Sequence, residues 1–399
     1  MFCQRCGKRN DLEREKCKYC SAPLLMVAPD RSSDASSVQP FMGVEEYLID
    51  KVAAMEKQSG RFSEEVDLLV HAMDFLERNA MVDRAGIHVL VEMLQERGLI
   101  EPKEFGRRWR ERTLRNLQDL YHKERLLDAK PEILAAFQGK SRRRFEELVA
   151  KAEDLLYSLD SKAASQALDH ALLIAPDNVP LLGCLGIIHL GLGRLDKAER
   201  CLSRAVQAKA PPPGAQLAYA RLLLHLGRPT EADKILSQAA QKHPEDTEAL
   251  MLLALAKAMA GDWLRCQHHA DKALGLEEHP ACSYLLAHAL LRRGRTTAAE
   301  KRLDELIAAY PEWEEALHQR ALLHLARGWW SRAEEALDRL RRLDPEVDSA
   351  KLVRQFKRTE RPKRAALAVL PLDVKRMLER MDPVAEEAGM YLRQLESEG

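Results

Sequence analysis

The sequence predicts an all-α protein whose second half is a series of repeated helix pairs, and two observations lead to this prediction. Aromatic residues make up only 5% of the 399 residues, and no stretch shows a sustained alternation of polar and β-branched residues, so strands are not expected. Glycines that could end a first helix also recur at a regular spacing, which is typical of stacked helix pairs. They are Gly193, Gly227, Gly261, Gly294 and Gly328, and they are 34, 34, 33 and 34 residues apart.

The N-terminal segment carries four of the eight cysteines, arranged as two CxxC pairs. Cys3 and Cys6 form one pair and Cys17 and Cys20 the other, with ten residues between the pairs. Four thiolates complete a tetrahedral zinc shell and leave no open position for catalysis. A redox CxxC pair would stand at a strand-to-helix junction, which is not visible here. A disulfide clasp conflicts with the cytoplasmic location expected below, so a structural metal site is favoured.

The motifs CQRCG and CKYCSAPL, with Asn10 between them, resemble the short zinc ribbons at the N-termini of many bacterial proteins. The resemblance covers residues 1–25 and implies a structural Zn²⁺ ion. Its implied ligands are Cys3, Cys6, Cys17 and Cys20. Ser21 stands where the pattern has a second glycine. Basic residues only mildly exceed acidic ones in this segment, so a structural or protein-contacting role is favoured over nucleic-acid binding.

A linker and a helical domain are predicted between the ribbon and the repeats. Residues 26–42 are rich in Ser, Asp and Ala without periodicity, which indicates a flexible linker. Residues 43–140 are helical in pattern, and one helix is expected to begin at Glu101-Pro102 because proline is tolerated in a first turn. Within residues 103–125, eight basic residues stand against four acidic ones. A solvated face is favoured there over a phosphate-binding stripe.

Residues 141–347 resemble a series of tetratricopeptide repeats, a family of antiparallel helix pairs of about 34 residues. The clearest copy is PLLGCLGIIHLGLGRLDKAERCLSRAVQAKAP, and its matching residues are Leu185-Gly186, Ala198, Leu202 and Ala205. A first unit over 145–178 lacks the turn glycine, so six units are expected. The resemblance implies a superhelix in which the first helix of each repeat faces the concave side.

The predicted partner-binding groove consists of the residues that the repeat phase places on that concave side. They are Glu153, Tyr157, Ile187, Arg221, His225, Leu255, Met259, Tyr284, His288, Arg292, His318 and Leu322. Arg, His and Tyr donors are spread along an apolar middle, which suits an extended or helical peptide with apolar anchors and some acidic groups. Trp263 and Trp330 share one repeat position and are expected in the core, whereas Trp329 is expected to be more exposed.

The C-terminal residues 348–399 are predicted to form capping and amphipathic helices. Residues 351–364 carry seven basic residues against Glu360, which is typical of a helix that caps a solenoid end; a contact surface for an acidic partner is the alternative. Residues 365–396 predict two short amphipathic helices separated by Pro383. These helices either dock on the solenoid or fill its groove in cis as a removable pseudo-ligand.

These features favour an interaction protein. The N-terminus lacks a secretory pattern and no run of about 18 apolar residues occurs, so a cytoplasmic location without membrane insertion is expected. Phosphate-cradling, dinucleotide-binding, zinc-protease and serine-hydrolase motifs are absent from the sequence. We therefore expect a non-enzymatic scaffold, adaptor or regulatory subunit that binds protein or peptide partners. The alternatives are a nucleic-acid-binding regulator that uses the ribbon and basic helices, and a direct regulator of a nucleotide-switch protein or kinase.

Overall fold

The computed structural model describes residues 89–343 and 348–384, together with isolated residues at 16, 18–20 and between 66 and 87. The chain divides into two compact units, Met1–Pro102 and Lys103–Gly399. In the first unit, residues 89–96 are helical, and Gly98 follows the end of this helix with a φ of 63°. The predicted zinc ribbon and linker lie outside the described residues, apart from Lys16 and residues 18–20.

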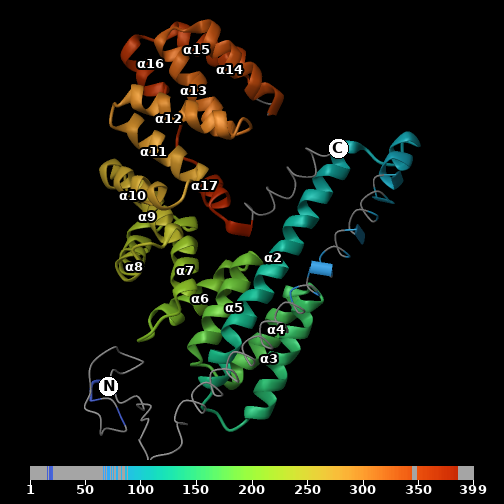
Figure 1. Cartoon of the computed structure of the whole chain (residues 1–399). Coiled ribbons are helices and arrows are strands. Elements are labelled where there is room, and N and C mark those ends of the chain that lie inside the picture. Colours follow the sequence, from blue (N-terminus) through green and yellow to red (C-terminus); the bar gives the residue numbers. More distant parts are fainter. Residues whose placement is uncertain are drawn as a thin grey trace, which may run out of the picture. The chain divides into compact units, whose positions relative to one another are not determined.

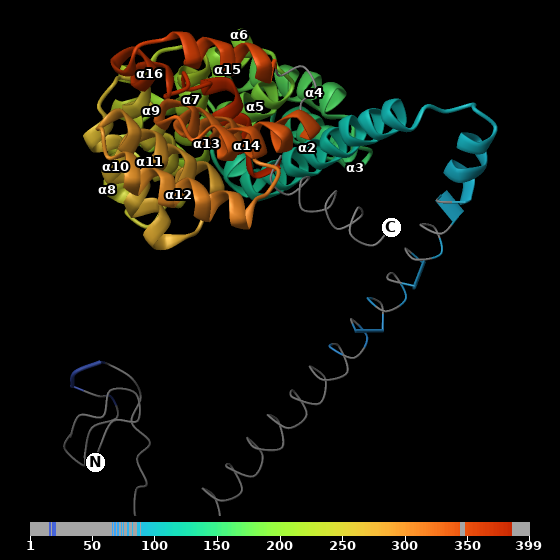
Figure 2. The same cartoon turned by 90° about the horizontal axis from the view of Figure 1, so that it is seen from above.

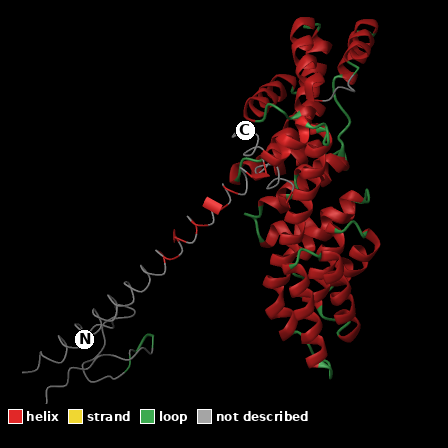
Figure 3. Ribbon diagram, turned by 90° about the vertical axis from the view of Figure 1, so that its right-hand side faces the viewer, coloured by secondary structure: helices red, strands yellow, loops and turns green. Residues whose placement is uncertain are grey.

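The second unit contains the six predicted helix pairs, each packed on the next (Figure 1). The pairs are α3 (Arg142–Tyr157) with α4 (Ser161–Ile174), α5 (Val179–Gly191) with α6 (Leu195–Val206), α7 (Pro213–His225) with α8 (Pro229–Lys242), α9 (Thr247–Met259) with α10 (Trp263–Leu276), α11 (Pro280–Arg292) with α12 (Thr296–Ala309), and α13 (Glu314–Arg327) with α14 (Trp330–Leu343). In Figure 2 the second helices α8, α10 and α12 lie along the outside of this unit. Figure 3 shows only helices and loops along 89–343 and 348–384.

The predicted turn glycines end the first helices in a left-handed conformation. Their φ angles lie between 69° and 78°, a region that glycine enters without steric cost. After Gly193, the N–H of Arg194 donates to the His189 carbonyl at 2.9 Å, which closes the helix end. The first pair has Leu159 at this place, with a φ of 55°. The flanking helices therefore impose the same turn on a leucine.

Small residues let the two helices of a pair approach closely. Each turn glycine is followed five residues later by a small residue, and all five are completely buried. They are Ala198, Ala232, Cys266, Ala299 and Ala333. Gly186 is a second close contact, because a Cβ atom there would lie 2.6 Å from the Cγ atom of Leu202.

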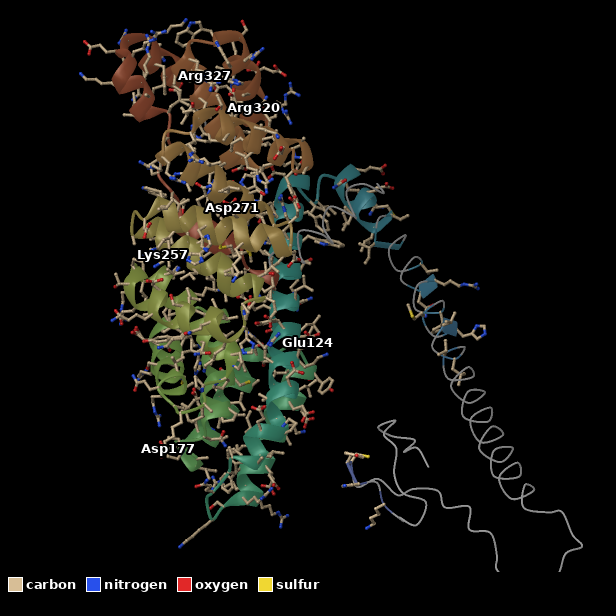
Figure 4. All side chains as sticks on the ribbon, turned by 60° about the vertical axis from the view of Figure 1, so that its left-hand side comes forward. Glu124, Asp177, Lys257, Asp271, Arg320 and Arg327 are labelled. Carbon is tan, nitrogen blue, oxygen red and sulfur yellow. The ribbon has the colours of Figure 1, made fainter. Side chains whose placement is uncertain are left out.

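Ion pairs join the charged surfaces of consecutive pairs. Arg228 lies 2.6 Å from Glu199, and Lys257 lies 2.8 Å from Asp233. Arg327 pairs with Glu300 in the same way. Figure 4 shows Lys257 and Arg327 among the charged side chains of the helices. Partly exposed pairs of this kind add little to stability.

Helix α2 (Pro102–Ala135) begins at the predicted proline and packs along the first repeats. Leu126 and Ile133 are completely buried in one apolar cluster with α3 to α6. The side-chain amide of Asn178 donates to the Ile133 carbonyl at 2.8 Å. The C-terminal part of the predicted 43–140 helical segment therefore packs with the repeats.

The basic segment after the last pair covers the end of the repeat series. It forms α15 (Ser349–Arg358) and α16 (Arg361–Leu367), and both helices contact α13. Phe356 is buried in the core, and the Lys357 ammonium lies 5.4 Å from the centre of the Trp330 ring. This arrangement protects the apolar face that the last repeat would otherwise expose.

Candidate partner-binding groove

The first helices α7, α9, α11 and α13 form a groove, and the chain's own C-terminal segment lies in it. We call residues 368–384, which include α17 (Val374–Arg380), the C-terminal strap. Helix α17 contacts α7 and α9, as Figure 1 shows. The strap contacts α13 and α11 near residue 368 and α7 near residue 381. It therefore runs opposite to the order of the repeats.

At the first end of the strap, two buried side chains bind its main chain. The Gln319 amide donates to the Ala368 carbonyl and accepts from the Leu370 N–H at 2.9 Å. The Nε2 atom of His288 lies 2.9 Å from the Leu370 carbonyl oxygen. Because a carbonyl only accepts, His288 must carry its proton on Nε2. Burial lowers the pKa of His288, which keeps the ring neutral in this contact.

In its middle, the strap presents basic side chains to an acidic corner of α13. Arg376 lies 3.4 Å from Glu314 and 3.5 Å from Glu315. Arg380 lies 3.3 Å from Glu315 and stacks 4.4 Å above the centre of the Trp313 ring. A cation over an indole face and beside a carboxylate is attracted by both. This corner therefore favours a positively charged occupant.

At the far end, Arg221 of α7 receives the C-terminus of α17. Its guanidinium donates to the carbonyls of Leu378 at 3.3 Å and Met381 at 3.0 Å. It also lies 3.7 Å from Asp382 and 2.7 Å from Glu248. Carbonyls at a helix end lack partners within the helix and carry partial negative charge. Arg221 supplies both the hydrogen bonds and the opposite charge.

Apolar side chains of the strap fill the space between these polar contacts. Met377, Leu378, Met381 and Val384 are each less than a tenth exposed. Met377 and Met381 are four residues apart, so they lie on one face of the turn. Both join the apolar cluster of α7 to α14. The strap thus combines apolar anchors with main-chain hydrogen bonds.

Two cavities flank the strap. The larger, of about 710 Å³, lies between the strap, α2, α5 and α7, with Tyr121 and Arg125 of α2 in its wall. Burial raises the pKa of Tyr121. The smaller, of about 170 Å³, is lined by Pro371 and Arg376 of the strap together with Glu314 and Glu315. The strap therefore occupies the groove without filling it.

The predicted groove residues fall into two sets. Ile187, Arg221 and His225 line the larger cavity, Tyr284 and His318 line the smaller, and Arg221 and His288 bind the strap directly.

The remaining predicted residues make none of the polar strap contacts described above. Leu255 and Leu322 belong to the apolar cluster that also contains Met377 and Met381 of the strap, and Met259 packs against this cluster. Arg292 lies over Trp263, Tyr157 lies beneath Lys123, and Glu153 pairs with Lys130. Partner binding by all of these residues stays a prediction.

The sequence prediction missed Gln319, Glu314, Glu315 and Trp313. Gln319 had a detectable signal. It stands nine residues before the turn glycine of its repeat. The same position in the four preceding repeats holds Cys184, Ala218, Leu252 and Leu285. A single amide at a position that is otherwise small or apolar indicates a buried polar contact. Glu314 and Glu315 gave no such signal, because acidic residues are common in the first turn of any helix.

Other predicted features have mixed outcomes. Trp329 is 41% exposed, as expected, while Trp263 and Trp330 pack against the core.

Three of the implied zinc ligands, Cys3, Cys6 and Cys17, lie outside the described residues, and only Cys20 is described. The zinc site stays a prediction. Among the described helices, none is long and apolar enough to cross a membrane.

Comparison with known proteins identifies the repeats. One tetratricopeptide repeat model matches residues 213–275, and a second matches residues 185–236 and 284–348. These residues carry tetratricopeptide repeats, which confirms that part of the resemblance.

Individual relatives are distant. Cellulose synthase operon protein C of Xanthomonas axonopodis pv. citri (strain 306) is 27% identical over 222 residues, which are 52% of this chain and 14% of that protein. This chain thus spans a small part of that relative. A tetratricopeptide repeat protein of Parabacteroides merdae ATCC 43184 is 22% identical with a TM-score of 0.47, and covers 60% of this chain and 99% of its own. YrrB, described as having an unusual peptide-binding site, is 19% identical with a TM-score of 0.39 over 42% of this chain and 87% of its own.

Proposed function

We propose that this protein is a non-enzymatic cytoplasmic scaffold or adaptor whose groove binds a peptide segment of a partner protein. One observation supports the proposal most strongly. Arg221, His288 and Gln319 come from three different repeats, and each hydrogen-bonds main-chain groups of a peptide segment. Main-chain groups are common to every peptide, so the same side chains suit a segment of another protein. Tetratricopeptide repeats commonly mediate such interactions.

The basic residues of α2 favour this function over nucleic-acid binding. Arg107 and Arg108 each form an ion pair with Glu104 at 2.7 Å, so a carboxylate in the same helix neutralises part of their positive charge. Arg125 lies 5.0 Å over the Tyr121 ring. These intrahelical partners reduce the net positive charge that this part of α2 offers to a phosphate backbone.

The test is affinity capture from the cells that make this protein. Full-length protein and a control variant, Lys301→Ala, should retain the same partners, because the Lys301 side chain is 81% exposed and makes one long ion pair on the outer helix α12. The double variant Arg221→Ala/His288→Ala should lose the groove partners, with circular dichroism as the check on folding. The same set of proteins captured by all three forms would contradict the proposal.

We further propose that residues 1–25 form a structural zinc ribbon that serves as a second docking surface. The supporting observation is the pair of CxxC motifs, whose four thiolates suit a closed zinc shell. Metal analysis of the purified protein should find one zinc per chain, and Cys17→Ser should lower this content. A purified protein without zinc would remove the ribbon from the proposal and leave the groove unaffected.

A further inference from the structure

We propose that the C-terminal strap is a removable self-ligand of the groove, and that the partner taking its place is a short helical peptide of the same chemistry. This inference rests on the proposed function. The partner peptide would carry two basic residues four positions apart on one face and Met or Leu side chains beside them. Its main chain would bind Gln319 and His288 at one end and Arg221 at the other.

The groove's polar residues are the first argument. Gln319 and His288 are each 1% exposed, and the Gln319 amide and the Nε2 atom of His288 bind the main chain of the strap. A buried amide or imidazole costs free energy unless it has a partner. The other repeats carry small or apolar residues at the position of Gln319, so the solenoid fold does not require this side chain. Its presence is explained by a ligand main chain.

The charges define the ligand more closely. Glu314 and Glu315 face Arg376 and Arg380 of the strap, and Trp313 lies under Arg380. An aromatic face beside two carboxylates selects a cationic side chain. The sequence predicts a peptide with some acidic groups, and Asp382 near Arg221 fits that expectation at the far end only. In the middle of the groove, the ligand must carry positively charged side chains.

The strap's own construction is the argument that it can leave. Helix α17 has 7 residues, which is too short to be stable by itself. Cavities of about 710 and 170 Å³ remain on its two sides, so the contact is less complete than that of the repeats. Tethering still gives the strap an effective concentration of about millimolar. A partner must therefore bind more tightly than the strap peptide does when separate.

The experiment uses the full chain and a fluorescent peptide of residues 368–384. The substitutions Met377→Asp/Met381→Asp weaken the binding of the chain's own strap in the groove. The peptide should therefore bind this variant at least tenfold more tightly than it binds the unmodified chain. Adding Arg221→Ala should weaken that binding at least tenfold, because it removes charge-assisted hydrogen bonds. Adding Lys301→Ala should leave it unchanged. A peptide with Arg376→Glu and Arg380→Glu should not bind.

A second measurement needs no substitution. Hydrogen exchange of the unmodified protein should show amides of 374–381 exchanging at least tenfold faster than those of α9 and α13, because the strap opens while the repeats stay folded. Equal protection of strap and core amides would overturn the proposal. So would a Met377→Asp/Met381→Asp variant that loses its helical signal, or one that stays folded and ignores the peptide. If the strap fails these tests while Arg221→Ala/His288→Ala still loses its captured partners, the groove function stands and only the self-ligand is wrong.

Discussion

Replacing Gly186 with alanine tests the close approach of α5 and α6 on which the repeat packing depends. The added Cβ would lie 2.6 Å from Cγ and 2.7 Å from Cδ2 of Leu202, and 3.3 Å from the Leu202 backbone nitrogen. The Leu202 side chain is completely buried, so it has no open space to move into. The helix pair must separate or Leu202 must leave its preferred rotamer.

The expected change in the free energy of unfolding of Gly186→Ala is the difference between two opposing effects. Alanine in place of glycine favours a helix by about 1 kcal/mol, whereas an extra methyl in a packed core costs about 1–3 kcal/mol. We expect Gly186→Ala to lower the free energy of unfolding by about 1 kcal/mol. Gly275→Ala in α10 is the control, because nothing lies within 4 Å of its added Cβ. That variant should gain up to about 1 kcal/mol from helix propensity alone.

The assay is urea unfolding followed by circular dichroism, with a double-mutant cycle. Leu202→Ala alone should cost about 2–5 kcal/mol, because it leaves a cavity. In the double variant, the Gly186→Ala methyl points into that space, so the combined loss should be smaller than the sum of the single losses by about 1 kcal/mol. Additive losses, or a Gly186→Ala variant as stable as Gly275→Ala, would refute the reasoning.

Three further predictions concern stability. Asn178→Ala should cost about 2 kcal/mol in urea unfolding, because it removes the α5 cap and the donor to the Ile133 carbonyl; an unchanged midpoint would contradict this. Burial lowers the pKa of His122 to about 4, so the unfolded chain takes up this proton near pH 6.5 and the folded chain only near pH 4. The free energy of unfolding should therefore fall by about 3 kcal/mol as the pH is lowered from 6.5 to 4. In His122→Asn, the free energy of unfolding should depend less steeply on pH over this range. Leu159→Gly should raise the midpoint, since it relieves left-handed strain of about 1 kcal/mol; a lower midpoint would show that the leucine's packing matters more.

The parts of the fold that follow from local chemistry could be predicted from the sequence. The turn glycines could be found because a φ near 70° strongly favours glycine, and their period then fixed the helix pairs. The first pair was harder, because Leu159 adopts the turn without the expected residue. For α2, the pattern predicted a helix but not its docking surface. The bond from Asn178 to the Ile133 carbonyl spans 45 residues, and local periodicity does not encode such a contact.

The strap could be predicted only in part, and the reason lies in one repeat position. Six residues before each turn glycine stand Ile187, Arg221, Leu255, His288 and Leu322. The repeat phase places all five toward the groove, and the phase alone does not distinguish among them. In the structure the two polar members bind strap carbonyls, while Leu255 and Leu322 join the core and Ile187 lines the larger cavity. The polar members thus mark where a peptide main chain passes. Finding which peptide this is required the tertiary structure, because Arg221 and Met381 are 160 residues apart in sequence.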